Sequence, residues 1–151
     1  MTSFTGTMFD MGATPALEQA MRFAETRHRL ILSNIANADT VGYRRQDLDS
    51  TRFQQVLGRA LDERDRHHPG TFIMREEVLA ARYHRGGFRP WTNLPYPGTD
   101  GPLRHDENNV SLEREMAHLA MNAGRYTTYA GLLDKIFTQI RSAISERPDQ
   151  A

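Results

Sequence analysis

The residues that could do acid–base or metal chemistry are scattered along this 151-residue chain. Four of the six histidines are His67 and His68, which are adjacent, and His84 and His105, which stand in loop-like sequence. Neighbouring imidazoles cannot both face one ion from a regular helix, and the chain has neither cysteine nor the His-x3-His spacing of a helical metal site. We therefore predict no metal ligand.

Two pairs of carboxylates, Glu76-Glu77 and Glu113-x-Glu115, have the residue types of a general acid and a general base. Both pairs occur in sequence expected to be helical, where neighbouring acids usually face water, and no nucleophile with a matching base accompanies them. The chain also has no P-loop, dinucleotide-binding fingerprint or serine-elbow motif. These patterns predict a protein without catalytic residues, without a cofactor and without enzymatic activity.

The most specific polar stretch is SNIANADTVGYRR, residues 33–45, which follows a run of helically spaced apolar residues. Side-chain amides can bond the last unpaired carbonyls of a helix or the turn after it, and glycine permits a positive φ where the chain reverses. A tyrosine ring can dock on a neighbouring helix while its hydroxyl stays bonded. The candidate residues are Asn34, Asn37, Asp39, Thr40, Gly42, Tyr43, Arg44 and Arg45.

Two long amphipathic helices are expected to position this stretch. The first begins with Thr14 as N-cap and Pro15 as first helical residue, and its apolar stripe, which includes His28, is Leu17, Met21, Ala24, Ile31 and Ile35. The second begins after ENNVS and ends before Pro148, with an apolar stripe of the same spacing at Leu112, Met116, Leu119, Ala123, Tyr126, Ala130, Leu133, Phe137, Ile140 and Ile144. At about 1.5 Å per residue, its roughly 35 residues span on the order of 50 Å.

Narrow stripes with this spacing are typical of coiled-coil seams. We predict a mainly α-helical fold whose N- and C-terminal helices form an antiparallel coiled coil or helical bundle, with an irregular middle segment. The C-terminal stripe is the longer one, and each large apolar side chain left in water costs roughly 1.5–3 kcal/mol. We therefore expect further copies or partners to cover the remainder; the alternative is a monomeric three-helix bundle.

The expected domain organisation follows from these helices and from composition along the chain. Residues 1–13 are predicted to be a flexible N-terminal tail, and residues 14–49 with 107–147 to form the axial helical domain. Residues 50–106 are the middle segment, with a loop rich in proline and glycine at 85–106. Its one expected helix, at 50–66, has an apolar face made of Phe53, Val56, Leu57, Ala60 and Leu61.

Overall composition bears on partners and location. The 19 basic and 19 acidic side chains balance, which gives no indication of nucleic acid binding. No apolar run approaches the roughly 18 residues of a transmembrane helix, and the first residues lack the regions of a cleavable signal peptide. By these rules alone the protein would stay in the cytoplasm. The mean hydropathy of -0.64 suits an elongated helical protein or one with an exposed middle segment.

Two segments carry a resemblance to a known family. LSNIANADTVGYRRQDLD (32–49) resembles the N-terminal signature of the bacterial flagellar axial proteins, the rod and hook family. ENNVSLEREMAHLAMNAGRYTTYAGLLDKIFTQIRSAI (107–144) is similar to the C-terminal helix of the proximal rod proteins in that family. The likeness covers roughly residues 15–57 and 105–145. Val41 stands where the family usually has proline, and Ser50 where it has phenylalanine.

The resemblance implies a structural subunit of the proximal rod of the flagellar basal body, which polymerises helically and transmits torque. It implies as partners other copies of the chain, other rod and rod-adaptor proteins, and the flagellar type III export apparatus. That apparatus would deliver the subunit to the periplasmic space without a cleaved signal peptide, in place of the cytoplasmic location expected above. Residues 34–45 would then contact a neighbouring subunit, with Arg44 and Arg45 pairing there with acids.

Other interpretations remain open at this point. The polar stretch could be an elaborate helix cap within one monomer. The chain could also be another flagellar axial protein, although the NNVSLE run (108–113) argues against that. A soluble helical regulatory or ligand-binding module is the remaining alternative.

Overall fold

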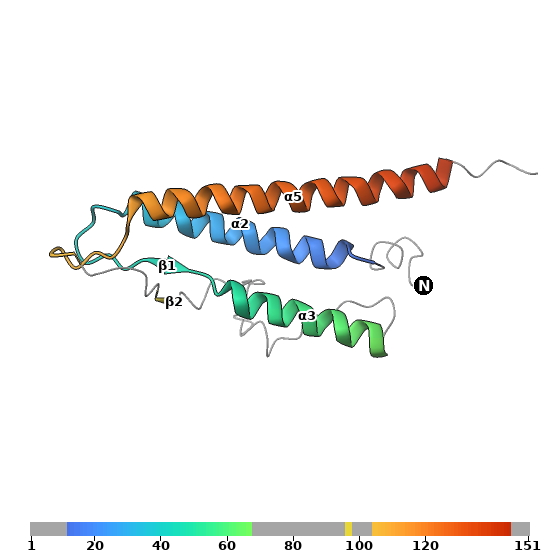
Figure 1. The fold of residues 1–151 in the computed structure, drawn as a ribbon, viewed down its shortest axis with the longest axis horizontal. Helices are drawn as coiled ribbons and strands as arrows, with labels where there is room; N and C mark the ends of the chain where they lie inside the picture. Colours follow the sequence, from blue (N-terminus) through green and yellow to red (C-terminus); the bar gives the residue numbers. More distant parts are fainter. Residues whose placement is uncertain (1–11, 68–95, 98–103, 146–151) are drawn as a thin grey trace, which may run out of the picture.

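The computed structural model describes residues 12–67, 96–97 and 104–145 (Figure 1). Its elements are helix α2 (Thr14–Ala36), strand β1 (Gln46–Asp47), helix α3 (Ser50–His67), strand β2 (Tyr96–Pro97) and helix α5 (Leu112–Ser145). The described chain is mainly helical with long N- and C-terminal helices, as predicted. Outside the described residues lie most of the expected tail and of the proline- and glycine-rich loop, and also Glu76-Glu77, His68 and His84.

Helix α2 begins one residue earlier than predicted. Its N-cap position is Ala13, and Thr14, the predicted N-cap, lies inside the helix and is buried. The reason is that the Leu17 N–H donates to the Ala13 carbonyl at 3.0 Å, so helical hydrogen bonding starts there. Pro15 still occupies the first turn, where its missing N–H removes no helical bond.

Helices α2 and α5 pack side by side and run in opposite directions (Figure 1). Two contacts define their alignment. Asn34, near the end of α2, bonds Glu115 in the first turn of α5, and Asn122, two turns later, donates to the carbonyl of Ala24. Because α5 has 34 residues and α2 has 23, the C-terminal part of α5 continues past the start of α2.

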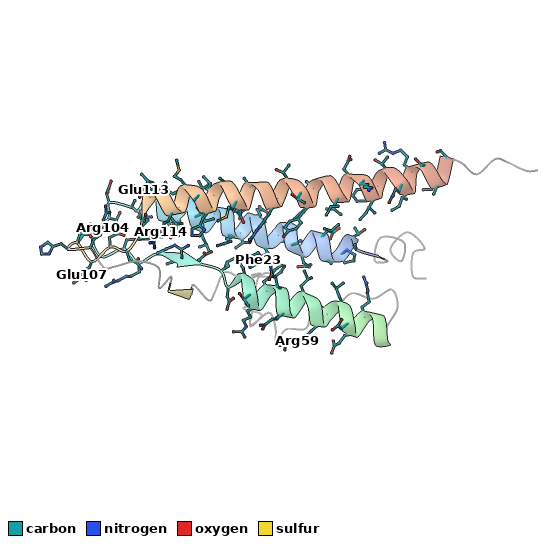
Figure 2. All side chains as sticks on the ribbon, in the orientation of Figure 1. Phe23, Arg59, Arg104, Glu107, Glu113 and Arg114 are labelled. Atoms are coloured by element: carbon teal, nitrogen blue, oxygen red, sulfur yellow. The ribbon has the colours of Figure 1, made fainter. Side chains whose placement is uncertain are left out.

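Helix α3 lies alongside α2, and an apolar cluster joins all three helices. The ring of Phe53 stacks on that of Phe23, with centroids 4.2 Å apart, and Figure 2 places Phe23 on the side of α2 that faces α3. Tyr129 of α5 packs against the same cluster. All five residues expected on the apolar face of this helix are buried or half-buried: Phe53, Val56, Leu57, Ala60 and Leu61.

A short antiparallel pairing of β1 with β2 was not predicted. Gln46 lies opposite Pro97, and Asp47 lies opposite Tyr96. The pairing holds β1, which follows the turn after α2, beside a segment about fifty residues later in the chain.

The face of α5 that α2 covers differs from the predicted apolar stripe. On α2 the stripe is inward, since Ala24 and Ile31 are buried and Leu17, Met21 and Ile35 are half-buried. On α5 the buried residues are instead Glu115 and Asn122. Of the predicted stripe, four residues are half-buried, namely Leu119, Ala130, Leu133 and Ile140, and six are exposed, namely Leu112, Met116, Ala123, Tyr126, Phe137 and Ile144. The helix is turned this way because its polar side chains find hydrogen-bond partners on and beside α2.

Candidate assembly site

The side chain of Asn34, fully buried near the end of α2, joins three segments of the chain. Its Nδ2 donates to the carbonyl of Gln46 at 2.7 Å and to Oε2 of Glu115 at 3.0 Å. Its Oδ1 accepts from the Gln46 N–H at 3.0 Å and from the Tyr43 hydroxyl at 3.1 Å. Both amide hydrogens and both acceptor positions are thus used. Asn34 therefore binds Gln46 as a neighbouring strand would, and at the same time ties α5 to α2.

Four charged side chains, of which Glu115 is bonded to Asn34, connect the same elements. Arg45 Nε donates to Oε1 of Glu115 at 2.5 Å, and Arg45 Nη2 donates to Oδ2 of Asp47 at 2.9 Å. Arg27 of α2 donates to both carboxylate oxygens of Asp47, at 2.7 and 2.8 Å. Two cations and two anions balance, which is a condition for burying charge. We refer to Arg27, Asn34, Arg45, Asp47 and Glu115 as the buried polar cluster.

Burial and pairing act in opposite directions on the ionisation of this cluster. Burial acts to raise the pKa of the Asp47 carboxyl, but the hydrogen bonds and charge of Arg27, the Leu48 N–H and the charge of Arg45 together hold that pKa below its ordinary value. Burial acts to lower the pKa of the Arg45 guanidinium, yet its bonds and charge interactions with Glu115 and Asp47 raise that pKa overall. Asp47 and Arg45 are therefore both charged at neutral pH, and the ion pair between them is a structural one.

A second buried asparagine, Asn108, attaches the segment before α5 to the turn after α2. Its Nδ2 lies 2.9–3.0 Å from the carbonyls of Asn37, Ala38 and Thr40. Its Oδ1 accepts from the Val110 N–H at 2.7 Å. These carbonyls belong to the C-cap residue of α2 and to the turn after it, so one side chain binds three points of that turn.

Backbone contacts extend this attachment through the reversal of the chain. Gly42 has a φ of 72°, and its N–H donates to the carbonyl of Asp106 at 2.9 Å. A Cβ at this position would meet nothing within 4 Å, so backbone conformation alone favours glycine here. Three residues later the Arg45 N–H donates to Oδ1 of Asn109 at 2.7 Å.

The tip of the turn faces water. Asn37 closes it locally, because its Nδ2 donates to the Ser33 carbonyl at 2.8 Å and its Oδ1 accepts from the Thr40 hydroxyl at 3.2 Å. Asp39, Thr40, Val41 and Gly42 are all exposed, and Val41 is 77% exposed. A side chain at that exposure packs little against the described chain and is accessible to a partner.

The two arginines expected to pair with an adjacent subunit differ. Arg45 does not fit the expectation, because its side chain is 5% exposed and already paired within its own chain with Glu115 and Asp47. Arg44 is half-exposed and lies 3.8 Å from the exposed Glu107, a contact that water weakens. Only Arg44 is therefore accessible to an outside acid.

The structure thus divides the eight candidate residues by position. Asn34, Tyr43 and Arg45 bond inward within one chain, while Asn37 and Gly42 shape the turn. The outward set is Asp39, Thr40, Val41 and Arg44, in which Val41 is an addition to the prediction. We refer to these four as the exposed tip.

Several residues that hold the site together were not predicted from the sequence. Among them are Arg27, Asp47, Asn108, Glu115 and Asn122. The expectation that both acids of the Glu113-x-Glu115 pair face water was wrong for Glu115, which is fully buried, and right for Glu113. A usable signal was present, since Glu115, Asn122 and Tyr129 recur every seven residues, the period of a helix contact face.

Large apolar side chains remain in water along α5. They are Leu112, Met116, Met121, Tyr126, Leu132, Phe137 and Ile144, each 40–65% exposed. Figure 2 shows side chains projecting outward along the whole length of the helix. Such a surface is typical of a protein that contacts other proteins.

Among the described residues no group of three or more histidines, aspartates or glutamates is placed to hold a metal ion. None of the described helices has both the length and the apolar composition needed to cross a bilayer.

Comparison with known proteins decides the family. Over 109 residues the chain is 32% identical to the flagellar basal body rod protein FlgB of Aquifex aeolicus, covering 72% of this chain and 73% of that protein. FlgB of Cereibacter sphaeroides is 32% identical over 126 residues, covering 83% of this chain and 88% of that protein. This chain belongs to the FlgB family. FlgB of Salmonella typhimurium is 30% identical over 113 residues, covering 72% of this chain and 75% of that protein.

Membership of the FlgB family confirms the resemblance drawn from the two terminal segments. No family model matches the chain. The FlgB relatives are matched over roughly three quarters or more of their own length, so the likeness extends beyond the two segments that first indicated it.

Proposed function

We propose that the protein is a structural, non-enzymatic subunit of the proximal rod of the bacterial flagellar basal body, and that its copies polymerise helically to transmit torque. The observation that carries the proposal is the set of large apolar side chains exposed along α5 in a chain whose relatives are basal body rod proteins. A rod subunit must cover such a surface with neighbouring subunits.

The buried polar cluster and the surface of α5 have different roles in this proposal. The cluster, with Asn108, holds α2, β1 and α5 as one body through bonds that each use a specific partner. Torque can pass through a subunit only if that subunit keeps its shape, and fully satisfied polar networks are rigid.

The outer faces of α5 supply the contacts between copies. Besides its exposed apolar side chains, α5 has two exposed glycines, Gly124 and Gly131, and a Cβ at either would meet nothing within 4 Å. Each costs about 1 kcal/mol relative to alanine inside a helix, and no contact within the described chain requires them. Close approach by a helix of a neighbouring copy accounts for both. In the polymer the terminal helices form a coiled coil, with the predicted stripes as seams between and within copies.

The exposed tip makes a second contact with a neighbour. Val41 offers an apolar side chain and Arg44 a charge, both at the end of the molecule where α2 reverses. The polar stretch at residues 33–45 is long because it has two roles. It binds α5 within its own chain, through Asn34 and Arg45, and it presents the exposed tip to a neighbour. Other rod and rod-adaptor proteins are the remaining partners. The type III export apparatus brings the subunit to the periplasmic part of the basal body without cleavage of a signal peptide.

The proposal is tested by deleting the gene and restoring it with a tagged copy. We expect the deletion strain to be non-motile, the tagged copy to restore swimming, and the tag to co-purify with isolated basal bodies. Purified protein should sediment as a monomer when dilute and as larger species when concentrated. A protein that stays monomeric at all concentrations and is absent from basal bodies would contradict the proposal.

A further inference from the structure

The contact face between α2 and α5 continues along α5 after α2 has ended. Glu115, Asn122 and Tyr129 face α2 or its apolar cluster and recur every seven residues. The next position in that series is Ile136, and Leu133 and Ile140 lie on the same face one turn to either side. The face changes from polar to entirely apolar at this point.

The alignment of the helices shows where α2 stops covering this face. Two contacts give the alignment, Asn34 with Glu115 and Ala24 with Asn122. Between them the point of contact moves ten residues toward the start of α2 and seven residues toward the end of α5. One more step of the same kind brings α2 to its first residue, Thr14, opposite roughly residues 129–132 of α5. The remainder of α5, as far as Ser145, continues past the start of α2 (Figure 1). Ile144, near its end, is 65% exposed.

The chain that precedes α2 emerges at this place. Its sequence, MTSFTGTMFDM, contains a single charged side chain, Asp10, and five large apolar residues at Met1, Phe4, Met8, Phe9 and Met11. Eleven residues reach about 16 Å as a helix and up to about 36 Å when extended. The thirteen or so residues of α5 beyond Thr14 span about 20 Å. The segment is thus long enough to cover this end of the face.

We propose that residues 1–11 of the same molecule dock on the apolar face formed by Leu133, Ile136, Ile140 and Ile144. Two observations carry this inference: the face continues an established helix contact, and the chain leaves α2 beside it. A tethered segment is present at millimolar effective concentration, which a second copy reaches only at high protein concentration. The faces of α5 that carry Met121, Leu132 and the two glycines point elsewhere on the helix and are left for neighbouring copies.

Engineered cysteines test the docking directly, because the chain has none of its own. One variant of the full chain carries Met8→Cys with Ile140→Cys. The control carries Met8→Cys with Met116→Cys, at the opposite end of α5, where the side chain is 55% exposed and therefore no less accessible than the half-buried Ile140. Both are oxidised with glutathione disulfide at low protein concentration and separated on non-reducing gels.

We expect the first variant to form an intramolecular disulfide several times faster than the control. Disulfide-linked dimers in the first variant would show that a second copy occupies the face and would overturn the proposal. Equal rates in the two variants would overturn it as well, since they would mean that residues 1–11 have no preferred position.

Hydrogen exchange provides a second readout that does not depend on cysteine. Removing residues 2–11 should increase amide exchange severalfold in residues 133–145 and leave residues 115–122 unchanged. Unchanged exchange at 133–145 would contradict the docking. Both experiments use dilute monomer and therefore do not depend on assembly. The docking of residues 1–11 can be disproved while the rod function holds, and the rod function can be disproved while the docking holds.

Discussion

Asn34 and Glu115, 81 positions apart in the chain, are hydrogen-bonded at 3.0 Å, and both residues are completely buried. This one contact joins the end of the N-terminal helix to the beginning of the C-terminal helix. Both side chains also bind the intervening segment, Asn34 through Gln46 and Glu115 through Arg45. The contact between the two helices and the shape of the turn are therefore stabilised by the same group of atoms.

Replacing Asn34 tests how much its side-chain amide contributes to the free energy of unfolding. Asn34→Ala leaves the N–H and carbonyl of Gln46 and one oxygen of Glu115 without this partner, so we expect the free energy of unfolding to fall by about 2–4 kcal/mol. Urea unfolding followed by circular dichroism at 222 nm measures the change. Asn37→Ala is the control, because that amide bonds a carbonyl near solvent, and we expect it to cost less than about 1 kcal/mol. Equal losses would contradict the assigned role of Asn34.

Glu113 and Glu115, two residues apart on α5, allow an exposed charge to be compared with a buried one. Glu115→Ala leaves Arg45 buried next to a missing partner and should destabilise the fold by about 3–5 kcal/mol. Glu113→Ala, at an exposed position two residues earlier, should change stability by less than about 1 kcal/mol. The double replacement of Arg45 and Glu115 by methionine should be more stable than Glu115→Ala alone. A double variant less stable than Glu115→Ala would show that the Arg45–Glu115 pair contributes more to stability than the mutual neutralisation of its charges.

Acid should weaken the fold through Asp47. Its pKa in the folded chain is below the ordinary value of 3.8, so its contribution to stability is complete above that value and is lost as the pH falls through the folded-state pKa. We expect Asp47→Asn to be less stable than the parent chain at neutral pH and to lose less stability between about pH 4 and pH 2. Urea unfolding at several pH values measures both effects. A parent and variant with parallel pH profiles would show that Asp47 is not held by Arg27 in solution.

Two glycines provide a matched test of backbone conformation. Neither Gly42 nor Gly58 has any atom within 4 Å of an added Cβ, but only Gly42 has a positive φ, of 72°. Gly42→Ala should destabilise by about 1 kcal/mol or more, whereas Gly58→Ala, inside α3, should stabilise by about 0.4–1 kcal/mol. Thermal unfolding compares the two. If both alanines stabilise the protein, the turn adopts another conformation in solution.

The helices could be predicted from sequence because apolar spacing and turn residues report local structure directly. The 14–49 and 107–147 segments contain α2 and α5, and Gly42 lies at the expected reversal. The rotation of α5 could not be read from the same pattern. A stripe chosen for apolar residues cannot include Glu115 and Asn122, whose burial depends on partners that come from α2 and β1.

For the candidate site, the sequence indicated which residues gather after α2 but not which of them face inward. The polar residues after α2 stand out by type and spacing, but their direction depends on pairing. Arg44 and Arg45 are adjacent and chemically identical, yet one is half-exposed and the other buried, because only Arg45 is placed to reach both Glu115 and Asp47. Arg27 lies one turn before Ile31 on α2, and nothing in its local sequence indicates that it binds Asp47.

The central claim is that the outer face of α5 is covered by neighbouring copies in the assembled rod. Leu132 is 45% exposed in the single chain, and the chain has no native cysteine, so Leu132→Cys can be labelled alone with a maleimide. Ile31→Cys, at a fully buried position, is the unreactive reference. We predict rapid labelling of Leu132→Cys in the isolated protein and strong protection in basal bodies purified from motile cells. Equally rapid labelling in both would contradict the claim.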